Sequence, residues 1–120
     1  MPRLSVTIIT LNEATHIEAC LASVAWADEV LVVDSGSTDG TPDLARARGA
    51  RVIVRGWPGY SEQKNFAAGE AAHDWILSVD ADERVTPELA SEIRAVLAAD
   101  PREAGFRMPR ARHLAVPARA

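Results

Sequence analysis

The chain has 120 residues and a mass of 12.9 kDa, which allows one domain at most. Its single cysteine, Cys20, excludes an internal disulfide and a multi-cysteine zinc site. Residues 1–100 carry sixteen acidic and eight basic side chains, whereas residues 101–120 carry one and five. Such an acidic body argues against nucleic acid as the main partner.

The N-terminal third contains a strand and a helix in turn. Residues 4–10, LSVTIIT, are β-branched and apolar on both faces, which predicts a strand buried in a parallel sheet. Residues 11–27 then place apolar side chains at helical spacing, with Asn12 as the expected N-cap. The side chains expected to face the core from this helix are Ile17, Cys20, Leu21 and Val24.

The middle of the chain repeats this alternation. Residues 29–34 predict a second buried strand, followed by a polar loop. Thr41 and Pro42 open a predicted helix, with the threonine hydroxyl as its cap, and Gly49 closes it. Residues 51–54 predict a third strand and residues 60–72 a third helix.

The C-terminal part contributes two more strands and one more helix. Residues 74–79 predict the fourth strand, and residues 104–109 the fifth. Between them, Thr86 caps a predicted helix whose inward side chains are Leu89, Ile93, Val96 and Leu97. This alternation predicts right-handed βαβ units, hence a Rossmann-like α/β fold with a mostly parallel sheet and helices on both faces.

Polar and mainly acidic side chains follow three of the predicted strands. Because ligands bind outside the carboxyl ends of parallel strands, these side chains predict a site. They are Thr10, Asn12 and Glu13 after the first strand; Asp34, Ser35, Ser37 and Asp39 after the second; and Asp80, Asp82 and Glu83 after the fourth. Neighbouring carboxylates destabilise a fold unless a cation or hydrogen-bond donors neutralise them. Oxygen ligands without histidine or cysteine favour Mg²⁺ or Mn²⁺, which carboxylates and substrate phosphates commonly share. The pattern therefore favours a sugar nucleotide bridged by a metal, with Lys64 available to a phosphate.

Four ordered motifs carry a resemblance to a known family: SVTIITLNEATHIEACLASV, VLVVDSGSTDGT, QKNFA and WILSVDADE. Over roughly residues 4 to 110 the chain resembles the family 2 glycosyltransferases with the GT-A fold. The likeness is strongest to the lipopolysaccharide core β-1,4-glucosyltransferases. The resemblance implies that Thr10, Asn12 and Glu13 line a nucleotide pocket and that Asp34 holds the base. It places Lys64 and Asn65 near the donor. It also implies that Asp80 lies by the ribose or sugar and that Asp82 binds the metal.

The same resemblance implies a function. The expected enzyme moves a hexose from a nucleoside diphosphate sugar, such as UDP-glucose, to a saccharide or lipid-linked acceptor in cell-envelope polysaccharide synthesis. Members of the family are longer and carry an acceptor-binding half with the catalytic base, for which this chain offers no candidate. One alternative is therefore a truncated, catalytically incomplete donor-binding fragment. Another is an Mg²⁺-dependent acidic-cluster phosphotransfer domain.

The domain assignment separates residues 1–110, the nucleotide-sugar-binding part, from an irregular basic tail at 111–120. No apolar run reaches the length of a membrane span, and the first ten residues lack a signal-peptide layout. The expected location is cytoplasmic. The arginine-rich tail is expected to be solvated, with peripheral contact at the inner membrane surface as the alternative.

Several residues also have structural interpretations. Asp39, Ser35 and Ser37 are expected to shape the polar loop after the second strand, and Cys20 to be a core residue. Trp75 is expected in the core, and Trp57 is the tryptophan favoured to face a sugar.

Overall fold

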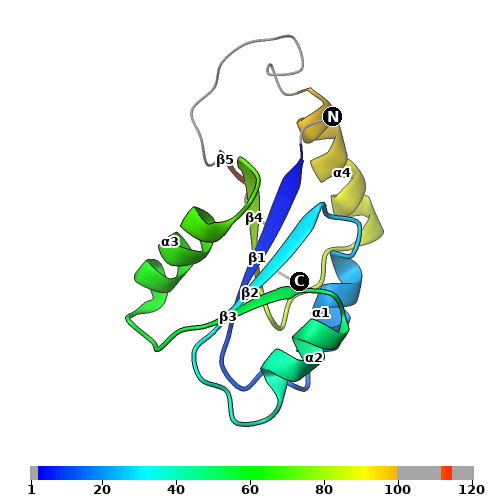
Figure 1. Ribbon diagram of the computed structural model, residues 1–120. Coiled ribbons are helices and arrows are strands. Elements are labelled where there is room, and N and C mark those ends of the chain that lie inside the picture. Colours follow the sequence, from blue (N-terminus) through cyan, green and yellow to red (C-terminus); the bar gives the residue numbers. More distant parts are fainter. Residues whose placement is uncertain (1–2, 100–111, 115–120) are drawn as a thin grey trace.

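A parallel sheet with the strand order β3-β2-β1-β4-β5 forms the centre of the molecule (Figure 1). The structure, a computed structural model, describes residues 3–99 and the backbone of residues 112–114. The strands are β1 (Leu4–Thr10), β2 (Glu29–Asp34), β3 (Arg51–Val54), β4 (Trp75–Asp80) and β5 (Arg112–Leu114). The first four agree with the predicted strands to within a residue or two.

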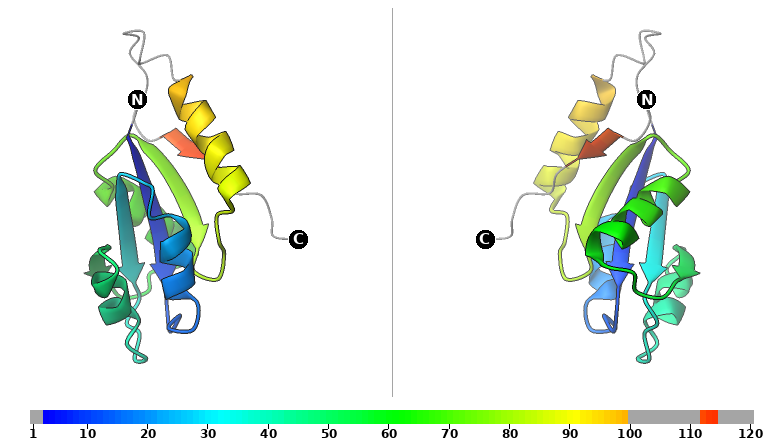
Figure 2. Two further views of the ribbon diagram at one scale, coloured as in Figure 1. Left: turned by 90° about the vertical axis from the view of Figure 1, so that its right-hand side faces the viewer. Right: turned by 90° about the vertical axis from the view of Figure 1, so that its left-hand side faces the viewer.

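Helices cover both faces of the sheet, as Figure 2 shows in two opposite views. They are α1 (Ile17–Ser23), α2 (Thr41–Ala47), α3 (Tyr60–Glu70) and α4 (Pro87–Ala98). The helices α1, α2 and α4 lie on one face, and α3 lies on the other. After β3 the chain crosses to the opposite side of β1: β2 and β3 lie on one side of β1, and β4 lies on the other. The predicted α/β class is confirmed, and the topological switch point lies between β1 and β4.

The hydrophobic core has one part on each face of the sheet. The larger part packs Val6, Ile8, Leu77 and Val79 of the sheet against α1, α2 and α4. The predicted helical stripe of α1 is confirmed, because all four of its apolar side chains are buried there. In the smaller part, Ala67 of α3 packs against Leu31 and Val33 of β2. Burial of each such aliphatic side chain contributes about 1.5–3 kcal/mol, so the core fixes the strands and thereby the position of their carboxyl ends.

The register places the three polar strand ends at one edge. Thr10 pairs with Asp34 across the β1–β2 ladder, and Ile9 pairs with Asp80 across the β1–β4 ladder. The side chains that follow these residues therefore start from the same level of the sheet.

Two predicted helix starts are wrong. Asn12 does not cap α1, whose N-cap residue is His16; Asn12 has a φ of 55° and belongs to a loop. Thr41 is the first residue of α2 and not its cap, since Gly40 occupies that position with a φ of 88°. In both cases the side chain makes a hydrogen bond to another part of the chain. Two predicted helix ends are confirmed. Thr86 caps the start of α4, where its hydroxyl accepts the Leu89 N–H at 3.1 Å. Gly49 follows the end of α2 with a positive φ.

The C-terminal part differs from the prediction in two details. Val96 is 47% exposed, so the inward face of α4 consists instead of Ala90, Ile93 and Leu97, with Leu89 partly buried. Residues 112–114, expected to be irregular, pair with β4 as the short strand β5, because the edge of β4 offers backbone partners. The strand predicted at 104–109 lies outside the described residues. Among residues 3–99 and 112–114, no helix is long and apolar enough to cross a membrane.

Candidate functional site

Asp34 organises the loop that follows β2. Its carboxylate is fully buried and accepts four hydrogen bonds. The Oδ1 atom accepts from the hydroxyls of Thr10 at 2.7 Å and Ser37 at 2.6 Å. The Oδ2 atom accepts from the backbone N–H groups of Gly36 at 3.0 Å and Ser37 at 2.7 Å. Asp34 therefore folds its own loop, and the predicted loop-shaping role of Ser37 is confirmed.

The charge of Asp34 is maintained by these donors. Burial opposes the charged form of Asp34, but the hydrogen bonds from Ser37, Thr10 and Gly36 outweigh it and hold the pKa of the carboxyl below its usual value. Asp39 in the same loop also has a lowered pKa, because the Thr41 hydroxyl and the Ala14 N–H donate to it. The predicted structural role of Asp39 is thereby confirmed.

The loop after β2 is tied to the loop after β1. Asn12 receives a hydrogen bond from the Thr38 N–H at 2.8 Å and donates its own backbone N–H to the Ser37 hydroxyl at 2.7 Å. The Glu13 N–H donates to the hydroxyl of Thr41 at 3.0 Å. Asn12 thus joins the two loops, while the Glu13 carboxylate remains available at the edge of a cleft.

That cleft, of about 290 Å³, opens at the carboxyl ends of β1 and β4. The strand ends contribute Ile9, Thr10, Leu11, Glu13, Asp80, Ala81 and Asp82, and the segment between β3 and α3 contributes Trp57 and Tyr60. In open α/β sheets ligands bind at the topological switch point, which is where this cleft lies. Four of the predicted site residues therefore meet in one cleft: Thr10, Glu13, Asp80 and Asp82.

The acidic residues at the turn after β4 differ in their contacts. The Glu83 carboxylate accepts the Asp80 N–H at 2.8 Å, and the Glu83 N–H donates to the Asp80 carbonyl at 2.9 Å. Glu83 therefore closes the turn, while the side chains of Asp80 and Asp82 are exposed and line the cleft. The Tyr60 hydroxyl donates to Asp80 Oδ1 at 3.4 Å.

The acidic side chains at this edge of the sheet decide whether a divalent cation fits there. No group of three or more His, Cys, Asp or Glu side chains that could hold a metal occurs in the described part of the chain. Asp34 and Asp39 are held by their own loop, so the acids that line the cleft are Glu13, Asp80 and Asp82. Two exposed carboxylates beside a cleft still fit Mg²⁺ or Mn²⁺, which typically take one or two carboxylates and complete their shell with water and phosphate oxygens.

Lys64 and Asn65 line a second hollow, of about 300 Å³, between α3 and the sheet. It shares Tyr60 with the cleft, and none of its lining residues is acidic. The Lys64 ammonium lies 5.1 Å from the centre of the Tyr60 ring and, among the described residues, makes no ion pair. The hollow also contains Thr7, a buried residue whose hydroxyl has no hydrogen-bond partner in the described part of the chain. Cations and hydroxyl donors without carboxylates suit an anionic group.

Gln63 and Arg55 are the residues at this edge that sequence reasoning missed. Gln63 is fully buried within α3, and its amide joins Ser35 at 3.3 Å, the Arg55 carbonyl at 3.1 Å and the Arg55 guanidinium at 2.9 Å. The guanidinium also lies 4.3 Å from the centre of the Phe66 ring. No local pattern marks a glutamine as buried, since its partners belong to two other loops.

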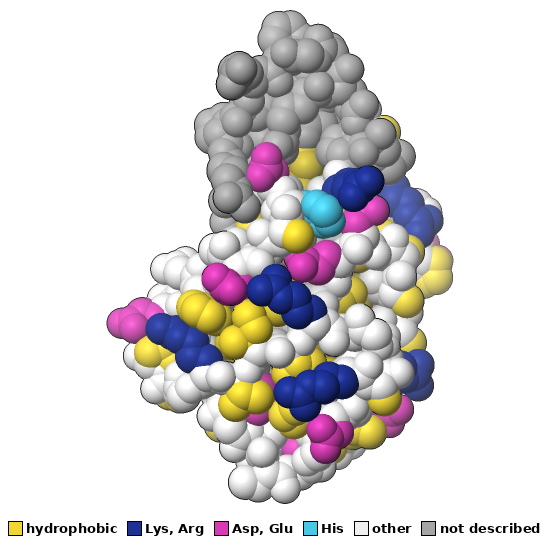
Figure 3. Space-filling model, in the orientation of Figure 1, with side chains coloured by type: hydrophobic (Ala, Val, Ile, Leu, Met, Phe, Trp, Pro, Cys, Tyr) yellow, Lys and Arg dark blue, Asp and Glu magenta, His cyan; other side chains and the backbone are white. Residues whose placement is uncertain are grey.

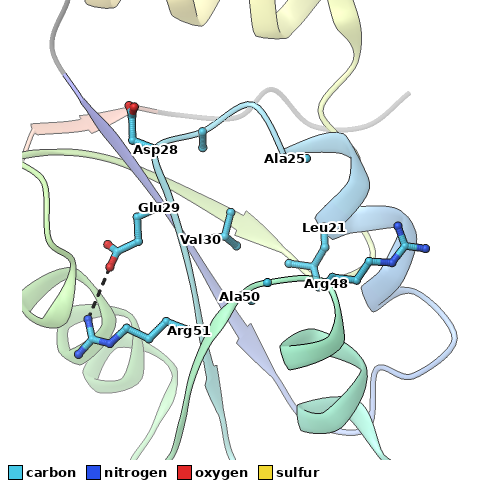
Figure 4. A pocket seen from close by; sticks show the side chains of 10 residues that line it. Leu21, Ala25, Asp28, Glu29, Val30, Arg48, Ala50 and Arg51 are labelled. Carbon is cyan, nitrogen blue, oxygen red and sulfur yellow. Dashed lines mark ion pairs between the residues drawn. The ribbon is translucent and has the colours of Figure 1, made fainter.

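The remaining features lie away from this edge. A cavity of about 290 Å³ lies at the amino ends of β2 and β3 (Figure 4). Its Arg51 pairs with Glu29 at 3.6 Å and its Arg48 with Glu18 at 3.5 Å, so these cations are already neutralised. On the face in Figure 3, Lys and Arg side chains lie among acidic and uncharged ones and form no continuous basic patch over the described residues. Cys20 and Trp75 are buried as predicted, and burial raises the pKa of the Cys20 thiol to about 12.

The parallel sheet with its switch point between β1 and β4, together with an acidic cleft at that point, defines a Rossmann-like α/β protein with a candidate ligand site. The model of the family Glycosyl transferase family 2 matches residues 5–112. The chain belongs to glycosyltransferase family 2.

Comparisons with individual proteins agree with this assignment. The chain is 50% identical over 97 residues to an uncharacterized glycosyltransferase of Rickettsia bellii, covering 80% of this chain and 33% of the relative. It is 36% identical to the lipopolysaccharide core biosynthesis glycosyltransferase LpsC of Rhizobium meliloti, covering 92% of this chain and 43% of the relative. The chain spans about a third of the length of the first curated relatives that it matches.

A solved structure resembles the fold. Glucosyl-3-phosphoglycerate synthase from Mycobacterium tuberculosis in complex with uridine diphosphate superposes with a TM-score of 0.62 at 32% identity, covering 68% of this chain and 34% of the other. The same synthase has been crystallised with Mn²⁺, UDP-glucose and phosphoglyceric acid. The comparison confirms the fold and relates it to a protein that binds a sugar nucleotide.

Proposed function

We propose that this chain forms the donor-binding part of an enzyme that transfers a hexose from a nucleoside diphosphate sugar. The observation that carries the proposal is the cleft at the topological switch point, lined by Asp80 and Asp82 from one strand end and by Thr10 and Glu13 from the other. Family membership and the uridine diphosphate complex of the structural relative support it.

The cleft supplies hydrogen-bond acceptors and apolar walls. Its carboxylates accept from hydroxyl and N–H donors, which suits the ribose and the edge of a base. Three carboxylates repel an isolated diphosphate, so a cation is needed where the phosphates meet them. Asp34 supports this region by folding the loop after β2. Its buried carboxylate accepts four hydrogen bonds, three from that loop and one from Thr10 of β1.

Asp82 is the residue that would hold Mg²⁺ or Mn²⁺, and Asp80 beside it is assigned to the ribose or sugar of the donor. When bound, the metal neutralises the charge that develops on the departing nucleoside diphosphate. The chain's own contribution is to fix the turn: Glu83 closes it, and Tyr60 hydrogen-bonds to Asp80. The crystallisation of the structural relative with Mn²⁺ supports the use of a divalent metal.

Lys64 and Asn65 are assigned to the charged part of the donor. Their hollow adjoins the cleft at Tyr60 and offers an ammonium, an amide and hydroxyls without a carboxylate. A phosphate of the donor that extends from the acidic cleft into this hollow can bind there without repulsion from a carboxylate.

The acceptor and the biological setting are proposed for the whole protein. The resemblance to LpsC supports a saccharide or lipid-linked acceptor and a role in lipopolysaccharide or other envelope polysaccharide synthesis. A cytoplasmic location with peripheral contact at the inner membrane surface is part of this proposal. The base that activates the acceptor hydroxyl is assigned to no residue of this chain.

Calorimetric titration of uridine, guanosine and adenosine diphosphates into the full chain, with and without Mn²⁺, tests the donor site. We expect one base to be preferred and its binding to require Mn²⁺. The variant Asp82→Asn should lose the Mn²⁺-dependent binding, whereas Asp43→Asn, at an exposed position of α2 that does not line the cleft, should retain it. Absence of binding by all three nucleotides, or metal-independent binding, would refute the proposal.

A further inference from the structure

Three large apolar side chains are half-exposed around the cleft. Trp57 and Tyr60 are each 52% exposed and Leu11 is 50% exposed, and all three line it. Apolar side chains of this size gather at a monomer surface where a ligand or partner covers them. The shape and chemistry of the cleft therefore indicate which part of the donor meets these residues.

A nucleobase fits these walls better than a hexose does. A base has two apolar faces and carries its polar groups at its edge, so it can stack on an aromatic ring while its edge reaches a carboxylate such as Glu13. A hexose can also stack the C–H face of its ring on an aromatic side chain, but its hydroxyls need polar partners around the whole ring, and Leu11 on the same wall supplies none.

The segment that carries Trp57 is fixed by buried contacts. It leaves β3 at Arg55, whose N–H donates to the Asp34 carbonyl at 2.8 Å, and enters α3 after Gly59, whose φ of 128° few other residues adopt. The fully buried Gln63 lies one turn into α3 and bonds both to Arg55 and to Ser35 of the loop after β2. Figure 1 shows this segment running from the end of β3 to the start of α3 on the other side of the sheet.

We propose that Trp57 forms the aromatic wall that stacks on the nucleobase of the donor, and that Gln63 is the positioning residue that holds this wall at the cleft. The inference rests on the proposed function, since it assumes a nucleotide donor. Direct contact is assigned to Trp57 alone; Gln63 acts through the Arg55–Gly59 segment.

Titrations of uridine, uridine diphosphate and UDP-glucose into the full chain, with Mn²⁺, test the role of Trp57. Trp57→Ala should weaken all three ligands by a similar factor of about 5 to 150, since loss of one base–aromatic stack has that effect. The quenching of tryptophan emission by uridine should persist in Trp26→Phe and disappear in Trp57→Phe. If Trp57→Ala weakens UDP-glucose alone, Trp57 contacts the sugar and the inference is wrong.

A double-mutant cycle tests the positioning role. Gln63→Leu should weaken uridine in the wild-type background and have little further effect in the Trp57→Ala background, because it acts through the same contact. General destabilisation would instead weaken both backgrounds equally and would refute the role of Gln63. If Gln63→Leu fails to fold, Arg55→Met provides the same cycle, since it removes the donor to Gln63 while its side chain can still cover Phe66.

The outcomes separate the two proposals. If the wild-type chain binds no nucleotide, the proposed function fails. If it binds uridine diphosphate and Trp57→Ala leaves the affinity unchanged, the donor site stands and only the further inference fails.

Discussion

The loops after β2 and β4 begin alike, with an aspartate at the end of a buried strand, but they use their acids in opposite ways. After β2, the Asp34 carboxylate is buried and accepts four hydrogen bonds. After β4, Asp80 and Asp82 are exposed and line a cleft, and the Glu83 carboxylate accepts the Asp80 N–H. Exposure at a cleft, rather than the presence of an acid, distinguishes a candidate ligand-binding carboxylate from a buried structural one.

The largest effect is expected from Asp34→Ala. This variant leaves two hydroxyls and two N–H groups without their acceptor, and hydrogen bonds to a charged group are worth about 1.5–3 kcal/mol each before non-additivity. We therefore expect a loss of about 3 kcal/mol or more in the free energy of unfolding, measured by urea denaturation. Asp34→Asn should lose less, because the two hydroxyl donors can rotate to suit an amide.

Asp43→Ala is the matched control, since Asp43 is exposed and, among the described residues, pairs only with Arg46 of its own helix. It should leave the urea midpoint almost unchanged. If Asp34→Ala is equally mild, Asp34 has no structural role and the comparison between the two loops is broken.

Acidification should weaken the loop after β2. The pKa of Asp34 and that of Asp39 are lowered in the folded state, so their contribution is present above the unfolded-state pKa of about 3.9 and is lost as the pH falls through the folded-state values. Urea midpoints of the wild type should therefore fall below about pH 4. The midpoints of Asp34→Asn should fall less steeply, and parallel curves for the two proteins would contradict this assignment.

Asp82→Asn should affect binding and not stability. Its side chain is exposed at the cleft, so we expect an unchanged urea midpoint and at least a tenfold loss of uridine diphosphate affinity, in the presence of Mn²⁺, from removal of a metal-binding carboxylate. Calorimetry and urea denaturation on the same preparation measure both quantities. A loss of stability with normal metal-dependent binding would assign Asp82 to the structural class instead.

Much of the fold was predictable because strands in a parallel sheet are marked by their own sequence. The runs at 4–10 and 51–54 are β-branched, and the structure begins and ends both strands at the predicted residues. The common location of Thr10, Glu13, Asp80 and Asp82 in one cleft was predictable, because each lies at or just after the end of a strand. It was not predictable for Gln63, because its partners come from segments 8 and 28 residues away.

The two Thr-Pro pairs show why local sequence is insufficient at helix starts. Thr86 caps α4, whereas Thr41 donates its hydroxyl to Asp39 and accepts the Glu13 N–H. The dipeptide is the same, but a nearby carboxylate and a distant backbone N–H compete for the second hydroxyl. Competition from such partners is absent from any local pattern.

The smallest effect is expected from Glu83→Gln, which tests the division of roles within the turn after β4. An amide oxygen can still accept the Asp80 N–H, so the free energy of unfolding should fall by no more than about 1 kcal/mol. Uridine diphosphate affinity should stay within about twofold of the wild type, because the predicted metal-binding and sugar-binding carboxylates are untouched. A loss of affinity as large as that of Asp82→Asn would show that Glu83 serves the ligand, and the turn would then contain three ligand-binding acids rather than two.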